Sequence, residues 1–530
     1  MRSMSCVSFC AALTRLVLSF VLLCCVPRFA FAKPAAVGKL QVTPASLKFT
    51  SPGHQSVTIK NIGGAALSGN VGTLSSSSFN VSSGGGAFDL APDATATVTV
   101  TFTGAPPKGK ASGKLAITAG KTSKNVSLSG TGLESSGTVI LFGGVPNTAN
   151  IIGNTDVFSS TGLSFSAAPE MNDSRGFEHY APYLDPAVVT GGAAGMVLVS
   201  GGQDNSDSIL NTTLLYDPTS NSFADGPPLN TARAEHSVTL FTTGALLGQV
   251  LIVGGLQLDE FGNRIALNDQ ELYNPAAGSI GDLGADMTDA RGQHTATLLN
   301  DGRILVAGGY DENFDHNGFN EATATAELFN PGSESFSCVT VGASSGTSTS
   351  ACPDVMSSSR WNHRATLLGD GTVLVTGGTP TDSGTKEGTA SADLFNPATD
   401  SFSALPDMTS ARQGHSATLI QGCDCAADGM VLLAGGQNQT GAVINTAELY
   451  DPSTKTFTAV GNMTSHRAEH QAVGFTTGGL AGYVLIMGGY PSPDEKGVNT
   501  AELFDPNTRK FIKIGSMTVD RYEFPATVIP

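Results

Sequence analysis

Arginine and histidine recur together along residues 175–521, and these are side chains that can bind anions or metal ions. The arginines are Arg175, Arg233, Arg291, Arg360, Arg412, Arg467 and Arg521. The histidines are His179, His236, His294, His363, His415 and His470. Acids recur in step with the arginines, at Asp156, Glu271, Glu327, Asp393, Glu448 and Glu502, with Leu214 in the remaining place. We therefore interpret the arginines as members of repeated, partly buried ion pairs. We interpret the histidines as partners of backbone groups between repeats.

The loops between the repeated segments contain the residues that we expect to bind a ligand. The aromatic candidates, which can stack on sugar rings, are Tyr310, Phe314, Phe319, Trp361 and Tyr490. Side-chain oxygens at every other position, as in a calcium loop, come from Asp311, Asn313, Asp315 and Asn317. Ala322 stands where a calcium loop has its final glutamate, although Glu321 is adjacent. A solvated acidic loop is therefore the alternative interpretation.

Apolar segments that end in a glycine pair recur at a spacing of roughly 50–70 residues. The pairs are Gly143-Gly144, Gly201-Gly202, Gly254-Gly255, Gly308-Gly309, Gly377-Gly378, Gly435-Gly436 and Gly488-Gly489. Asp-Gly pairs such as Asp301-Gly302 precede some of these segments and favour tight hairpin turns. A third segment, such as AELFNP around Glu327, and a fourth near Phe336 complete the unit. This unit resembles the kelch repeat, which implies one four-stranded blade of a β-propeller per unit.

The two ends of the repeat predict how the propeller closes. The first unit begins at Gly137 with a second strand and lacks a first strand. The segment from Met517 to Ile529 matches a first strand. We therefore expect residues 137–530 to form a seven-bladed kelch-type β-propeller closed by the C-terminal strand, because closure protects the sheet edges.

Residues 33–136 have a different pattern, with little charge and many Ser, Thr, Val and Gly residues. Alternating segments include 40–49, 57–63 and 126–132. The second and last of these resemble immunoglobulin-like modules related to hydin and abnormal-spindle proteins. The resemblance implies an immunoglobulin-like β-sandwich that acts as a spacer or docking module. The predicted fold class of the chain is therefore all-β.

The first 32 residues have the layout of a secretory signal peptide. Arg15 precedes an apolar run from Leu16 to Val26, and Ala30-Phe31-Ala32 is a small-x-small cleavage pattern. A lipoprotein signal that uses Cys24 or Cys25 is the alternative. We expect a secreted or cell-envelope protein, extracellular or periplasmic.

The charge balance argues against some partners. The chain has 28 Lys and Arg residues against 45 Asp and Glu residues, for a net charge of −17. An acidic chain repels phosphate backbones, so we expect no nucleic-acid partner. Beyond residue 32 no apolar run reaches the ~20 residues of a membrane helix, so we expect no transmembrane span in the mature chain.

Four cysteines follow the predicted signal peptide, and export would allow them to oxidise. Cys338 and Cys352 flank an insertion rich in Ser, Thr and Gly, so we predict a disulfide between them. Cys423 and Cys425 are only two residues apart. For these two, free thiols or pairing elsewhere stay open.

The propeller repeats also resemble the central domain of galactose oxidase and its radical-copper relatives. That resemblance implies a copper site with a Tyr-His dipeptide, but this chain has only His179-Tyr180, in reverse order. We therefore assign no copper ligand, and calcium is the one metal cofactor considered.

The predicted function is binding or adhesion, in which one propeller face recognises a glycan or an extracellular protein. One alternative is an extracellular, carbohydrate-active enzyme that uses the same face. A structural envelope component is the other alternative, since fold alone does not decide function.

Overall fold

The computed structural model describes residues 36–49, 53–72, 74, 79–102, 110–131, 137–146, 150–176, 181–311, 321–342, 351–380, 387–493 and 496–530. Within these residues the regular structure is β-strand, apart from one short 3-10 turn at Gly478–Leu480. The predicted all-β fold class is confirmed. A search of the same residues for an apolar helix long enough to cross a membrane finds none.

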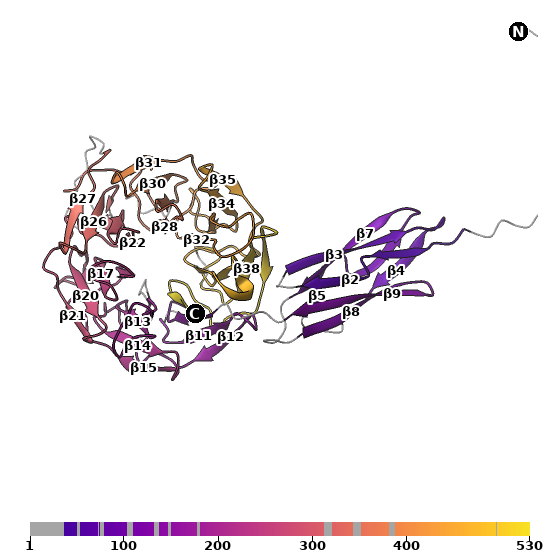
Figure 1. The fold of residues 1–530 in the computed structure, drawn as a ribbon, viewed down its shortest axis with the longest axis horizontal. Helices are drawn as coiled ribbons and strands as arrows, with labels where there is room; N and C mark the ends of the chain where they lie inside the picture. Colours follow the sequence, from indigo (N-terminus) through magenta and orange to yellow (C-terminus); the bar gives the residue numbers. More distant parts are fainter. Residues whose placement is uncertain are drawn as a thin grey trace, which may run out of the picture.

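The N-terminal strands form two sheets around one hydrophobic core (Figure 1). The first sheet has the order β1 (Leu40–Thr43), β3 (Gly53–Asn61), β7 (Thr95–Phe102) and β5 (Phe79–Ser83). The second has the order β2 (Ser46–Phe49), β9 (Thr122–Thr131), β8 (Lys110–Ala119), β4 (Leu67–Val71) and β6 (Gly86–Leu90). Alternate residues of β3 and β7, such as Val57 and Val98, are buried, as expected for strands with one face on a core. The rings of Phe49, Phe79 and Phe102 lie 5.0–5.7 Å apart at its centre.

The remaining sheets follow one another around a ring (Figure 1). The first sheet has the order β12 (Ser164–Ala168), β11 (Thr155–Ser159), β10 (Thr138–Phe142) and β40 (Ala526–Ile529). The second has the order β13 (Val197–Ser200), β14 (Thr213–Asp217) and β15 (Ser222–Asp225). The next two are β16 (Ser237–Leu240), β17 (Val250–Val253), β20 (Gln270–Asn274), β21 (Ser279–Gly281), and β22 (Thr295–Leu298), β23 (Ile304–Ala307), β26 (Ala326–Asn330), β27 (Ser335–Cys338). Then come β28 (Arg364–Leu367), β29 (Val373–Thr376), β30 (Ala392–Asn396), β31 (Ser401–Ala404), and β32 (Ser416–Leu419), β33 (Val431–Ala434), β34 (Ala447–Asp451), β35 (Thr456–Ala459). The last sheet is β36 (Gln471–Gly474), β37 (Val484–Met487), β38 (Ala501–Asp505), β39 (Lys510–Lys513).

Burial along each ring sheet follows the position of the strand. Second strands such as β23, with the sequence ILVA, are buried at every residue because neighbouring sheets cover both of their faces. First strands such as β22 are half-buried and adjoin the first strands of the neighbouring sheets around the centre of the ring. Outer strands such as β35 are mostly exposed. Apolar second strands therefore hold the sheets together, and first strands line the centre.

The C-terminal strand completes the first sheet of the ring. β40 pairs antiparallel with β10, with Thr138 opposite Ile529 and Leu141 opposite Ala526. A buried ion pair between Arg521 Nη2 and Asp156 Oδ2, at 2.7 Å, joins the same two parts of the chain. The ring is thus closed between segments from opposite ends of the repeat.

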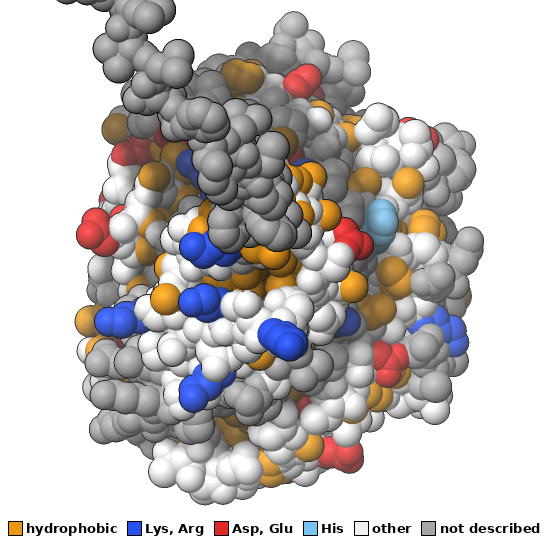
Figure 2. All heavy atoms as spheres, turned by 90° about the vertical axis from the view of Figure 1, so that its right-hand side faces the viewer, with side chains coloured by type: hydrophobic (Ala, Val, Ile, Leu, Met, Phe, Trp, Pro, Cys, Tyr) orange, Lys and Arg blue, Asp and Glu red, His pale blue; other side chains and the backbone are white. Residues whose placement is uncertain are grey.

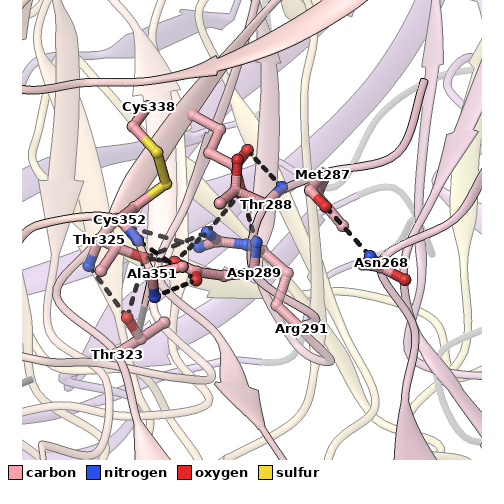
Figure 3. The surroundings of a disulfide bond; sticks show 11 residues. Asn268, Met287, Thr288, Asp289, Arg291, Thr323, Thr325, Cys338, Ala351 and Cys352 are labelled. Atoms are coloured by element: carbon pink, nitrogen blue, oxygen red, sulfur yellow. Dashed lines mark hydrogen bonds and ion pairs between the residues drawn. A yellow bond between two sulfur atoms is a disulfide. The ribbon is translucent and has the colours of Figure 1, made fainter. Parts of the chain in front are cut away.

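Two disulfides lie in the ring. Cys338 and Cys352 are joined with a Cα–Cα distance of 5.5 Å. Figure 3 shows that the segment at Cys352 lies close to Arg291. Asp289, which pairs with Arg291, accepts hydrogen bonds at its Oδ1 from the N–H groups of Ala351 and Cys352, at 2.8 and 3.4 Å. The other disulfide joins Cys423 and Cys425 to each other, whereas the sequence analysis left open free thiols or pairing elsewhere.

Charged side chains are scattered over the face of the molecule seen in Figure 2. Lys, Arg, Asp and Glu stand apart from one another there, among uncharged side chains and backbone. This matches the low charged fraction of 14% in the chain. Such a face presents mixed signs of charge rather than a field of one sign.

Candidate functional site

The repeated arginines are fully buried and hold each sheet together. Arg291 Nη1 donates to the carbonyl oxygen of Gly308 at 2.8 Å, and its Nη2 donates to Glu327 Oε1 at 3.1 Å. The same acid pairing occurs in Arg233–Glu271, Arg360–Asp393, Arg412–Glu448, Arg467–Glu502 and Arg521–Asp156. In the sheet where Leu214 replaces the acid, Arg175 pairs with Asp173 at 2.6 Å. The prediction that these arginines are architectural is confirmed.

The glycine pair allows this arrangement. Gly308 has a φ of +62°, and a Cβ atom there would lie 2.6 Å from the carbonyl oxygen of Arg360 in the next sheet. Only glycine permits both the left-handed backbone and this close approach. Arginine, glycine pair and acid are therefore parts of one repeated interaction.

The histidines connect neighbouring sheets, but through side-chain hydroxyls. His294 Nε2 lies 2.8 Å from Ser237 Oγ, and His363 Nε2 lies 2.9 Å from Thr295 Oγ1. The predicted partners were backbone groups, and among the hydrogen bonds described only His294 Nδ1 has one, the carbonyl oxygen of Arg291 at 3.1 Å. That prediction was wrong for Nε2, because Nε2 faces the first or second strand of the preceding sheet, where Ser and Thr side chains project.

These histidines are neutral at physiological pH. Burial and the positive charge of Arg291 lower the pKa of His294 to about 3. Burial, together with nearby arginines, also lowers the pKa values of His363, His415 and His470 well below 6.5. Each neutral imidazole forms a hydrogen bond with a hydroxyl group of the preceding sheet and so joins two neighbouring sheets. We call these contacts the seams between the sheets, and His294, His363, His415 and His470 the seam histidines.

The residue just before the histidine, or just before Phe524 in the segment that leads to β40, has an unusual backbone in the six ring sheets where the structure describes it. Glu235, Gln293, Asn362 and Glu469 have φ values of 54°, 48°, 52° and 50°. Gly414 and Glu523, at 57° and 49°, occupy the same position in their sheets. Non-glycine residues are uncommon in this region, and such conformations cluster at functional sites. We call Glu235, Gln293, Asn362, Gly414, Glu469 and Glu523 the axial residues.

Backbone hydrogen bonds connect the axial residues in ring order. Each N–H donates to the carbonyl oxygen of the preceding axial residue, at distances of 2.9–3.4 Å. The chain of bonds runs from Glu235 through Gln293, Asn362, Gly414 and Glu469 to Glu523. The left-handed backbone thus brings these residues together from successive sheets at the centre of the ring.

The axial side chains form a buried polar network. Asn362 Nδ2 donates to Glu469 Oε1 at 2.5 Å and to Gln413 Oε1 at 2.8 Å. Gly414 leaves space for this contact, because a Cβ atom there would lie 2.3 Å from Glu469 Oε1. Glu469 is only 7% exposed. The network therefore holds a carboxylate that has little access to water.

A second buried carboxylate lies on the same side of the ring. The Tyr310 hydroxyl donates to Glu235 Oε2 at 2.5 Å, and Arg264 Nη1 lies 3.4 Å from Glu235 Oε1. Burial raises the pKa of Glu235, and the hydrogen bond from Tyr310 and the charge of Arg264 oppose that shift. Arg264 belongs to β19 (Arg264–Ala266), which pairs with β18 (Leu256–Leu258) in a hairpin.

Tyr490 contributes an unpaired hydroxyl near the axial acids. Its side chain is 7% exposed, and its hydroxyl has no hydrogen-bond partner among the described residues. Burial raises the pKa of Tyr490, and the negative charges of Glu469 and Glu523 raise it further. The phenol therefore remains protonated.

A cavity of about 450 Å³ opens at the centre of the ring beside these residues. The axial residues Gln293, Asn362, Glu469 and Glu523 line it. The first strands supply the other polar lining side chains, Ser237, Thr295, Thr297, Arg364, Gln471 and Thr527. Amides, hydroxyls and carboxylates thus face one half-open space of the size that binds small ligands.

The aromatic residues proposed from the sequence are not free stacking platforms where the structure describes them. Tyr310 is 3% exposed and Tyr490 is 7% exposed. The Tyr310 ring packs edge-on against Trp361 at 5.4 Å, and Tyr490 packs against Tyr522 in the same way. These aromatics surround the axial residues, and a ligand-binding role for them stays a prediction.

The other predicted site residues cannot be placed. Phe314, Phe319, Asn313, Asp315 and Asn317 lie outside the described residues. The backbone of Asp311 begins a short hairpin, β24 (Tyr310–Asp311) with β25 (Glu321–Ala322). The calcium site there stays a prediction. The one cluster of potential metal-binding side chains among the described residues is Glu327, Cys338 and Cys352. The sulfur atoms of Cys338 and Cys352 are joined in a disulfide, so they are not free thiolate ligands.

Comparison with known proteins identifies one repeat of the ring. The Kelch motif matches residues 421–464, which include strands β33, β34 and β35. Among solved structures, the chain resembles one described as the structure of YjhT, with 12% identity and a TM-score of 0.46, over 65% of this chain and 99% of that chain. Among curated proteins no match is found. The Kelch motif and the ring of sheets, six of which have four strands and one of which has three among the described residues, support a kelch-repeat β-propeller.

Proposed function

We propose that this chain is an exported binding protein whose propeller recognises a glycan by holding one sugar residue in the axial cavity. The observation that carries the proposal is the half-open cavity of about 450 Å³, lined by amide, hydroxyl and carboxylate side chains of the axial residues and of successive first strands. We assign residues 1–32 to a signal peptide, 33–136 to an immunoglobulin-like sandwich and 137–530 to a seven-bladed propeller.

The lining suits a ligand with many hydroxyl groups. A sugar hydroxyl both donates and accepts hydrogen bonds, so it can donate to Glu469 and accept from an amide such as that of Gln293 or Gln471. The side-chain oxygen of Gln293, which lines the cavity, adds an acceptor that has no hydrogen-bond partner among the described residues. A purely structural channel would gain nothing from buried polar groups left unpaired, because such groups cost stability.

Blocking the cavity tests the proposal. Thr297 lines the cavity from β22, so Thr297→Trp should abolish binding of the methyl glycosides of glucose, galactose, mannose and N-acetylglucosamine in saturation-transfer NMR. Ser337 lies exposed on β27, the outermost strand of the same sheet, so Ser337→Trp is the matched control. If both variants bind the glycosides as the unchanged protein does, the site is elsewhere.

A second function, hydrolysis of the bound glycan, is favoured by one observation. Glu469 and Glu523 line the same cavity from adjacent sheets, and pairs of carboxyl groups are the usual machinery of glycoside hydrolysis. Release of reducing ends from oligosaccharides, lost in Glu469→Gln, would establish it. Binding without release of reducing ends would leave the binding function alone.

A further inference from the structure

In three of the ring sheets the residue that follows the histidine forms a hydrogen bond with the histidine of the next sheet. Ser237, Thr295 and Ser416 occupy this position in β16, β22 and β32. Each hydroxyl lies 2.8–2.9 Å from Nε2 of the histidine in the next sheet. The position is therefore part of the seam between neighbouring first strands.

Arg364 breaks this pattern. It occupies the same position in β28, where a hydroxyl would be expected to meet His415 of the next sheet. His415 instead lies 3.0 Å from Thr376 Oγ1, on the second strand β29. The seam is complete without Arg364, so this arginine has no part in the repeated architecture.

The guanidinium of Arg364 is only partly used by the protein. Its Nη1 donates to Asn362 Oδ1 at 3.3 Å and to the carbonyl oxygen of His363 at 3.0 Å. An arginine has five N–H donors, and no carboxylate of the described residues lies within ion-pair distance of this one. The fully buried arginines of the repeat, by contrast, each pair with an acid.

Arg364 also lines the axial cavity, where it is the one arginine or lysine among the described lining residues. Its positive charge acts on the interior, since it contributes to the lowered pKa values of His363, His415 and His470. Asn362 connects it to Glu469, because the amide accepts from Arg364 and donates to Glu469 Oε1. The cavity therefore has a basic side and an acidic side.

We propose that Arg364 binds a carboxylate of the ligand, so that the axial cavity selects an acidic sugar residue, a hexuronate, over the neutral hexose. This rests on the proposed sugar-binding function. The planar guanidinium matches a carboxylate with two parallel hydrogen bonds. A singly charged carboxylate also suits a cavity that contains Glu469 and Glu523 better than a doubly charged phosphate does, because like charges repel.

Paired probes test this selection. Isothermal titration calorimetry would compare methyl glucuronide with methyl glucoside and methyl galacturonide with methyl galactoside, with acetate as a probe for the carboxylate alone. We expect one acidic sugar to bind roughly ten- to hundredfold more tightly than its neutral partner, which is the usual range for a charged hydrogen-bonded pair. Arg364→Gln should remove this preference, and Arg364→Lys should restore part of it.

The control removes the same charge elsewhere. Lys513 lies exposed on the outermost strand β39. Lys513→Gln should therefore keep the preference for the acidic sugar. Equal affinity for acidic and neutral sugars in the unchanged protein would overturn the selection and leave sugar binding intact. A preference that survives in Arg364→Gln would overturn the assignment to Arg364. Tight binding of acetate alone would overturn the sugar part, and binding of no probe would overturn both proposals.

Discussion

The ion pair that closes the ring should contribute far more to stability than its counterpart in the next sheet. Arg521 pairs with Asp156, and both side chains are fully buried. Arg175 pairs with Asp173, whose side chain is 31% exposed. Each arginine also donates to two backbone carbonyl groups, at 2.8 and 3.0 Å for Arg521 and 3.1 and 3.2 Å for Arg175. The two sites therefore differ mainly in whether water reaches the acid.

The expected losses follow from this difference. Arg521→Met leaves a buried carboxylate without its cation, which costs about 3–5 kcal/mol of unfolding free energy. Arg175→Met leaves an acid that water can reach, so only hydrogen bonds to a charged group are lost, about 1.5–3 kcal/mol. Methionine keeps a similar length and apolar stem in both variants, so packing losses should be comparable.

Urea unfolding followed by tryptophan fluorescence would measure both losses. Trp361 is the single tryptophan of the chain and lies in the ring, so its emission reports on the ring rather than on the N-terminal sheets. A loss in Arg175→Met that equals or exceeds the loss in Arg521→Met would refute the reasoning. Burial of the acid would then not determine the energy of these pairs.

Three further results are expected. Because the pKa of His294 is lowered to about 3, the unfolded chain binds a proton more readily than the native protein below pH 6.5. Stability should therefore fall as pH falls from 6.5 towards 3, and His294→Phe should lessen the slope by up to about 1.4 kcal/mol per pH unit in urea titrations. Replacing Cys338 and Cys352 by Ser should lower the unfolding free energy by about 3 kcal/mol in the same assay, whereas an unchanged urea midpoint would show that the disulfide contributes nothing. Gly414→Ala should displace the Glu469 carboxylate and weaken sugar binding at least tenfold by calorimetry, and unchanged affinity would remove Glu469 from the site.

The sequence was sufficient to predict the repeat because its residue types are tied to backbone positions. Arg291 contacts both Gly308 and Glu327 within one sheet, so an arginine, a glycine and an acid recur with the sheet, and Leu214 is the one exception among the acids. The pairing of the last strand with the first sheet followed from the same pattern. Such contacts repeat in register and leave a visible period.

The candidate site was missed because its common feature is a backbone angle rather than a residue type. Glu, Gln, Asn and Gly all occupy the axial position, and what they share is a positive φ. One signal was present, since the residue before the histidine is an acid or amide in most repeats. The burial of Tyr310 was beyond sequence reasoning because its hydrogen-bond partner, Glu235, is 75 residues away in the chain.

The closure of the ring by β40 also determines the order in which the protein can fold. Asp156 and Arg521 are separated by 365 residues, so the first sheet cannot be completed until nearly the whole propeller has been synthesised. Until then β10 exposes an edge that can pair with other chains. Contacts between residues so distant in sequence form slowly. A nascent chain of this protein therefore passes through a long interval in which its earliest propeller strands depend on protection from aggregation.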